Sequence, residues 1–196
     1  MSNFSPNKII IHCTDSGWAN LAIVDSWHRQ RGFDEIGYHF LILNENTDPE
    51  LASSGTDGFI QFGRSLNKMG AHCLGQNNKS IGIALVGKDS FSKKQMASLS
   101  KLVDWLIEQF NIDPGQVFAH REFNSKKTCP NFDIDFWMDY RHEEGDIEVI
   151  DGFVHCSKEV DIKKSCPVEG NCNKIKESVD AIKKVLGVNK EIDCEL

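Results

Sequence analysis

The sequence lacks the long apolar segments that would place it in or across a membrane. It contains no stretch of about 18 apolar residues, the length that spans a bilayer. Residues 1–8 also lack the basic segment and apolar run of a secretory signal. We therefore expect synthesis in the cytoplasm and no membrane insertion.

Positive charge is also scarce. The 22 Lys and Arg residues are outnumbered by 29 Asp and Glu residues, which gives a formal net charge of −7. A chain with this charge has no general attraction to nucleic acid or to anionic membrane surfaces. We expect no nucleic-acid partner.

The cysteines do not form a recognisable framework. Seven cysteines are an odd number in a chain of 196 residues, which argues against a disulfide scaffold. The spacing of His120 and Cys129, with eight residues between them, fits no zinc-finger pattern. Reduced thiols and metal ligation are the expected uses of these residues.

What the sequence does contain is an alternation of short apolar runs and amphipathic segments. The predicted strands cover residues 8–12, 38–43, 58–62, 80–86 and 116–119. The predicted helices cover residues 20–31, 92–110 and 132–140. Strands interleaved with helices indicate a layered α/β domain.

Composition changes after residue 140, which predicts a domain over residues 1–140 and a small C-terminal extension over 141–196. The extension contains a strand-like segment at 147–155 and an amphipathic helix at 173–186. It would be marginal alone and is a candidate appendage for binding another protein. Its cysteines are expected to be unligated thiols, with a structural metal site or a disulfide as alternatives. They are Cys156, Cys166, Cys172 and Cys194.

Two histidines and a cysteine from distant segments form a candidate metal site. His12 ends the first predicted strand, His120 follows the strand at 116–119, and Cys129 lies in the next loop. Two imidazoles and one thiolate suffice for catalytic zinc, which keeps a fourth position open for water. Cys13 is the less suitable neighbour, because adjacent side chains of a strand point to opposite faces. The sequence therefore predicts a Zn²⁺ hydrolase.

An ordered series of motifs over residues 8–137 resembles one family. The series is similar to the zinc-dependent N-acetylmuramoyl-L-alanine amidase type 2 family, which includes the T-odd phage lysozymes and the peptidoglycan recognition proteins. The resemblance implies a central mixed β-sheet flanked by helices. The matching segments are residues 9–14, 27–33, 36–40, 63–64, 70–73, 77–83, Gln95 and 129–133.

The resemblance also implies roles for individual residues. His12, His120 and Cys129 would be the zinc ligands, and Tyr38 and Lys127 the catalytic residues. Zinc lowers the pKa of a bound water to about 7. A nearby ammonium such as that of Lys127 would stabilise the developing oxyanion, and the Tyr38 hydroxyl would orient water or move a proton.

Two further positions match motifs near the family's substrate groove. His72 and Asn78 are expected to contact substrate, with a buried structural role as the alternative for His72. Some family members carry a catalytic glutamate in the strand that corresponds to residues 80–87, whereas residues 83–86 here are Ile-Ala-Leu-Val. Proton transfer is therefore expected to fall on Tyr38.

The expected function is hydrolysis of the amide between the lactyl group of N-acetylmuramic acid and L-alanine in peptidoglycan. A phage-type endolysin that reaches the cell wall after synthesis in the cytoplasm is the first interpretation. A cytosolic amidase that recycles muropeptides and a non-catalytic peptidoglycan-binding module are the alternatives. Contact with another protein, such as an RNA polymerase, is a further hypothesis that no motif here identifies.

Overall fold

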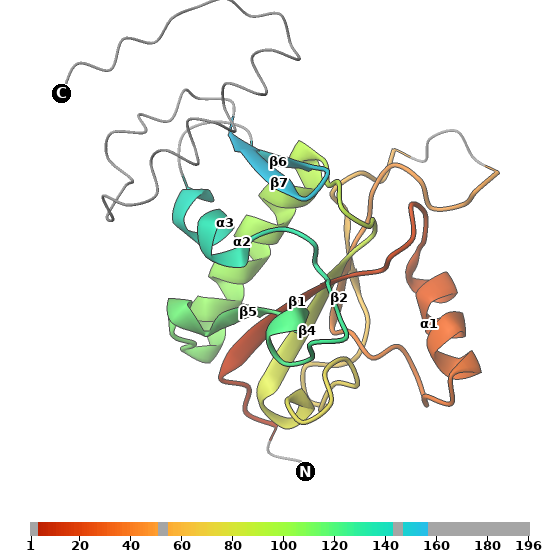
Figure 1. Ribbon diagram of the computed structural model, residues 1–196. Coiled ribbons are helices and arrows are strands. Elements are labelled where there is room, and N and C mark those ends of the chain that lie inside the picture. The colour runs from red at the N-terminus through yellow and green to blue at the C-terminus, as the bar shows by residue number, and fades with distance from the viewer. Residues whose placement is uncertain (1–3, 51–54, 143–146, 157–196) are drawn as a thin grey trace, which may run out of the picture. The chain divides into compact units, whose positions relative to one another are not determined.

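Five strands form the central sheet in the part of the chain that the computed structural model describes, residues 4–50, 55–142 and 147–156 (Figure 1). The sheet order is β3-β2-β4-β1-β5, and every neighbouring pair is parallel except β2 and β3. This is the mixed sheet that the resemblance to the amidase family implies. The strands are β1 Lys8–Cys13, β2 Phe40–Ile42, β3 Ile60–Phe62, β4 Ser80–Leu85 and β5 Val117–Ala119.

Helices cover both faces of this sheet. One face packs against α1, Leu21–Gln30, and the other against α2, Lys93–Phe110, and α3, Ile134–Tyr140 (Figure 1). The described residues also form three short 3₁₀ helices. They are η1 Asn77–Lys79, η2 Pro114–Gln116 and η3 His120–Glu122.

Alternation along β1 assigns its side chains to the two faces. Ile9, Ile11 and Cys13 belong to the core that packs against α2 and α3. His12 points to the opposite face, where its ring lies 5.1 Å from the ring of Tyr38. Because successive side chains of a strand alternate, the apolar run that anchors β1 also places His12 on the α1 side.

Local signals fix the predicted helix boundaries. The Ser92 hydroxyl accepts from the backbone N–H of Gln95, whose side chain accepts from the N–H of Ser92, a reciprocal capping box that begins α2. Asn20 caps α1 by accepting from the N–H of Ile23. The predicted helices over 20–31, 92–110 and 132–140 are therefore confirmed to within about two residues.

The segment predicted as one strand at 147–155 is instead a hairpin. It consists of β6, Ile147–Ile150, and β7, Phe153–Cys156, which pair antiparallel. Asp151 and Gly152 between them have φ values of 49° and 84°, and the Asp-Gly pair favours such a two-residue turn. The sequence signal was present at these two residues, but the prediction of a single strand was wrong.

The hairpin packs on the main sheet domain. Phe91 and Val149 exchange two backbone hydrogen bonds of 2.8 and 2.9 Å, and β6 contacts α2. A boundary after residue 140 stays a prediction. The predicted helix at 173–186 lies outside the described residues, as do Cys166, Cys172 and Cys194.

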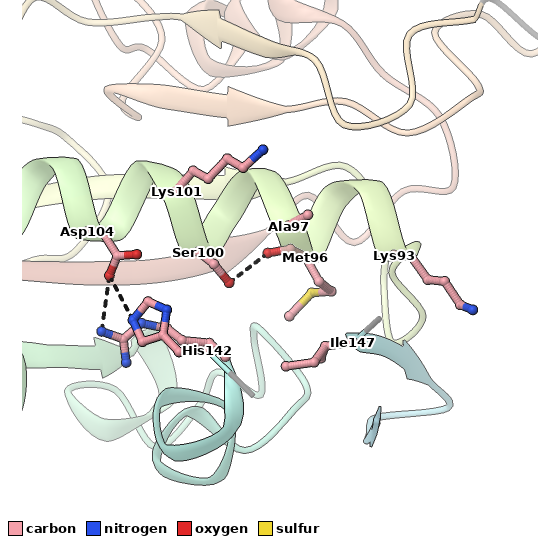
Figure 2. A pocket seen from close by; sticks show the side chains of 9 residues that line it. Lys93, Met96, Ala97, Ser100, Lys101, Asp104, His142 and Ile147 are labelled. Atoms are coloured by element: carbon pink, nitrogen blue, oxygen red, sulfur yellow. Dashed lines mark hydrogen bonds and ion pairs between the residues drawn. The ribbon is translucent and has the colours of Figure 1, made fainter. Parts of the chain in front are cut away.

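A cavity of about 240 Å³ lies between α2 and the segments around His142 and Ile147 (Figure 2). At one end, the Asp104 carboxylate accepts from Arg141 Nη2 at 3.2 Å and lies 3.3 Å from His142 Nε2. The predicted metal ligands do not line this cavity. Among the described residues, no helix combines the length and apolar character needed to cross a lipid bilayer.

Candidate metal centre

The parallel pairing of β1 with β5 brings two predicted ligands together. Ile11 pairs with Ala119. His12 and His120 directly follow these two residues and therefore lie at the same edge of the sheet. Their ring centroids are 4.5 Å apart. Carboxyl ends of parallel strands meet at one edge, which is why residues 108 positions apart in the sequence become neighbours.

Cys129 completes the group from the loop after η3. Its backbone carbonyl accepts from the N–H of Arg121 at 3.2 Å, and its Sγ lies 3.4 Å from His120 Nδ1. One potential ligand atom from each of His12, His120 and Cys129 lies within 4.8 Å of the other two. The structure thus gathers the three residues that the sequence singles out as ligands.

The charge states of this group suit a metal. The hydrogen bond from the Cys13 thiol, then the contacts with the His12 and His120 rings, hold the pKa of Cys129 well below its ordinary value, so its sulfur is a thiolate at neutral pH. Burial lowers the pKa of His12 to about 4, which keeps its imidazole neutral. Neutral imidazole and thiolate are the forms that bind metal, and this donor set fits zinc.

Cys13 contributes to the site without facing the same side as His12. Its hydrogen bond to Cys129, together with burial, raises the pKa of the Cys13 thiol, so it is the proton donor of the pair. Asn131 Nδ2 lies 3.7 Å from the Cys13 sulfur and donates to the Lys88 carbonyl at 2.7 Å. From the sequence, Cys13 is a less suitable ligand than His12. Nothing in the sequence indicated that the Cys13 thiol contacts Cys129.

Tyr38 and Lys127 lie at different depths around the centre. Tyr38 is half-buried just before β2, and burial raises the pKa of its phenol, so the hydroxyl keeps its proton at neutral pH. Lys127 is exposed two residues before Cys129, and its charge contributes to the lowered pKa of His12. Tyr38 is thus placed as a hydrogen-bond donor and Lys127 as a solvent-facing cation.

The two residues expected to contact substrate occupy different environments. His72 is buried, and its Nδ1 lies 3.0 Å from Nε2 of His12. Asn78 is exposed on η1. Substrate contact by either residue stays a prediction. Asn77, the neighbour of Asn78, has a structural role that the sequence did not assign. Its side-chain oxygen accepts from the N–H groups of His72 and Cys73 at 2.9 and 2.8 Å.

Arg64 is a second residue whose role only the structure assigns. Its guanidinium is buried and donates to the carbonyls of Ile36 and Met69 at 3.0 and 3.1 Å and to the Asp34 carboxylate at 2.6 Å. It joins the segment before Tyr38 to the segment before His72. The Gly-Arg pair at 63–64 is one of the matching motifs, but the sequence contains nothing that names its partners.

Comparisons with known proteins agree with this fold. The family model described as N-acetylmuramoyl-L-alanine amidase matches residues 2–132. The chain therefore belongs to the N-acetylmuramoyl-L-alanine amidase family.

Individual relatives include phage, bacterial and insect proteins. The endolysin of Escherichia phage T7 is 31% identical over 147 residues, which cover 69% of this chain and 87% of the endolysin. The structure of the amidase LysC from Clostridium intestinale is 32% identical with a TM-score of 0.56, covering 65% of this chain and 78% of LysC. Drosophila PGRP-LB in complex with tracheal cytotoxin is 26% identical with a TM-score of 0.52, covering 64% of this chain and 76% of PGRP-LB.

Proposed function

We propose that this protein is a zinc-dependent amidase that hydrolyses the lactyl-L-alanine amide of peptidoglycan, as a phage-type endolysin. One observation carries the proposal: His12, His120 and Cys129 place potential ligand atoms within 4.8 Å of one another at one edge of the sheet. Similarity to the T7 endolysin over most of both chains supports the cell wall as the place of action. Similarity to a PGRP-LB complex with tracheal cytotoxin supports a muropeptide as the ligand.

Zinc is the metal that this donor set favours. Two imidazoles and one thiolate are a sufficient ligand set for catalytic zinc, which would still be able to bind water or substrate. When bound by these residues, zinc would lower the pKa of a bound water to about 7 and would polarise the scissile carbonyl. His12, His120 and Cys129 would hold it in the proposed enzyme.

Tyr38 and Lys127 supply the functions that the ligands lack. The phenol of Tyr38 remains protonated, so it donates a hydrogen bond that orients the attacking water or the carbonyl. The Lys127 ammonium is exposed, and in the proposed reaction it stabilises negative charge as the carbonyl becomes tetrahedral. Residues 83–86 on and after β4 carry no carboxylate, so the phenol is the proposed proton-handling group.

Digestion of purified sacculi tests the reaction. The wild-type protein should release free L-alanyl stem peptides, identified by mass, and lose this activity with a chelator until zinc is restored. Release of disaccharides would instead indicate a glycosidase. Binding to sacculi without release of any fragment would indicate a non-catalytic module. Efficient cleavage of soluble muropeptides but not of intact sacculi would indicate a recycling amidase.

Three variants assign the roles. Cys129→Ala should lose both bound zinc and activity, whereas Lys127→Ala should retain zinc and lose about 10²–10³-fold in kcat. Lys126→Ala is the matched control, because Lys126 is an equally exposed lysine on the same loop. Equal zinc loss in the Cys129 and Lys127 variants would contradict the assignment.

A further inference from the structure

A line of hydrogen bonds runs from the candidate metal ligand His12 into the protein interior. His12 Nε2 and His72 Nδ1 are 3.0 Å apart, and both side chains are buried. On the other side of the His72 ring, Nε2 lies 3.5 Å from the carbonyl oxygen of Ser80 and 3.4 Å from its hydroxyl oxygen. The His72 ring therefore connects His12 to the first residue of β4.

The partners of Ser80 determine where the protons lie. The Ser80 hydroxyl donates to the carbonyl of Gln76 at 2.8 Å, so its oxygen acts as an acceptor toward His72. The Ser80 carbonyl is also only an acceptor. His72 must therefore carry its proton on Nε2, and its Nδ1 is left as an acceptor.

The same reasoning extends to His12. Since His72 Nδ1 accepts, His12 carries its proton on Nε2 and donates it to His72. A neutral imidazole has one protonated nitrogen, so the lone pair of His12 lies on Nδ1. This nitrogen is the one left to bind a metal.

The surroundings of His72 hold its ring in place. A Cβ added at Gly82 would lie 2.5 Å from His72 Cγ, and one added at Gly70 would lie 2.5 Å from His72 Cδ2. The two glycines thus allow the backbone to approach the ring closely at two positions. Asn77 fixes the His72 backbone, because its side-chain oxygen accepts from the N–H groups of His72 and Cys73 at 2.9 and 2.8 Å.

We propose that His72 is a positioning residue for the metal centre, which fixes the tautomer and orientation of His12 through the hydrogen bond between His12 Nε2 and His72 Nδ1. Outer-shell partners of this kind orient ligating histidines and raise their basicity. This role differs from the substrate contact expected from the sequence. It rests on the proposed zinc-dependent function, since it assigns His12 Nδ1 to zinc.

Zinc affinity of the free protein is the first test, measured by competition with a chromogenic chelator. His72→Leu fills similar space without an acceptor and should weaken zinc binding by about 10–100-fold. His72→Asn places an amide oxygen near the position of Nδ1 and should recover most of that loss. Leu99→Ala, a buried change in α2 on the opposite face of the sheet, controls for general destabilisation and should leave affinity unchanged.

The His12 tautomer is the second test and needs no metal. Long-range ¹H–¹⁵N correlation spectra of the metal-free protein should show the His12 proton on Nε2 in the wild type and in His72→Asn. In His72→Leu, the proton should distribute between both nitrogens. A wild-type His12 protonated on Nδ1 would overturn the inference even if His72→Leu does not fold.

The outcomes separate this inference from the proposed function. A wild-type protein that binds no zinc would overturn the proposed function, and the tautomer measurement would still test the hydrogen bond. Zinc binding by the wild type with equal affinity in His72→Leu would overturn only the positioning role. Unchanged zinc affinity with a raised KM for muropeptide in His72→Leu would assign His72 to substrate contact instead.

Discussion

Removing the Arg64 guanidinium should destabilise the protein more than any exposed charge substitution. Arg64→Met keeps the length of the aliphatic stem and removes the donors to the carbonyls of Ile36 and Met69. The Arg64 side chain is 8% exposed, whereas its carboxylate partner Asp34 is 76% exposed. The energetic loss is therefore expected to come from the carbonyls, because water can replace the arginine at Asp34.

The magnitude follows from these two hydrogen bonds. Each is donated by a charged group, and such bonds contribute about 1.5–3 kcal/mol. The exposed ion pair adds about 0–1 kcal/mol. We expect the free energy of unfolding to fall by about 3–7 kcal/mol, a large part of the 5–15 kcal/mol typical of a domain.

Urea unfolding followed by circular dichroism measures this loss. With a slope of about 2 kcal/mol per molar urea, the midpoint should fall by about 1.5–3.5 M. Arg29→Met is the matched control, because Arg29 is 56% exposed and pairs with Asp25 one turn away, a contact that contributes about 0.5 kcal/mol. Arg64→Lys should recover part of the loss. If Arg64→Met unfolds at the same urea concentration as Arg29→Met, the argument from buried carbonyls is wrong.

Three other predictions concern pH, metal and backbone packing. Burial lowers the pKa of His39 to about 4. The unfolded chain therefore takes up a proton at this residue near pH 6.5 and the folded chain only near pH 4, so stability should fall by about 3 kcal/mol as pH drops through this window. Urea titrations of metal-free protein at several pH values should show that stability falls less steeply with decreasing pH in His39→Gln than in the wild type. An equal pH dependence of stability in the two proteins would contradict this. A chelator should lower the Tm of the zinc-loaded wild type but not the Tm of Cys129→Ala. If free zinc had been at 100 times its Kd, the stability lost by the wild type is about 2.7 kcal/mol. A Cβ at Gly37 would overlap the carbonyl oxygen of Ala71, whereas one at Gly17 meets nothing within 4 Å. Gly37→Ala should therefore cost about 1–3 kcal/mol in thermal unfolding, and Gly17→Ala far less.

Most of the secondary structure could be predicted because its causes are local. Each signal involves residues that are close together in the sequence. Examples are the apolar run at 8–12, the helical spacing between residues 92 and 110, and the capping pair of Ser92 and Gln95. The strand at 38–43 is shorter than predicted, since β2 begins at Phe40. The hairpin at 147–156 was missed because an apolar run was given more weight than the Asp-Gly pair inside it.

The candidate ligands could be named from the sequence, but their proximity depends on sheet pairing. His12, His120 and Cys129 carry the donor types that zinc requires, which is a property of residue identity. Their approach to within 4.8 Å depends on β1 and β5 lying parallel with Ile11 opposite Ala119. Residue identity at each position says nothing about that register.

By itself, the sequence determined the strands and helices to within about two residues in most cases, the resemblance to an amidase family and the chemical types of the candidate ligands. Only the tertiary structure decided that His12 Nε2 lies against His72 Nδ1 and what Arg64 holds together. Both depend on partners 28 to 60 residues away in the chain. The direction of a hydrogen bond is set by which acceptors lie nearby in space, and those acceptors become neighbours only when the sheet has formed.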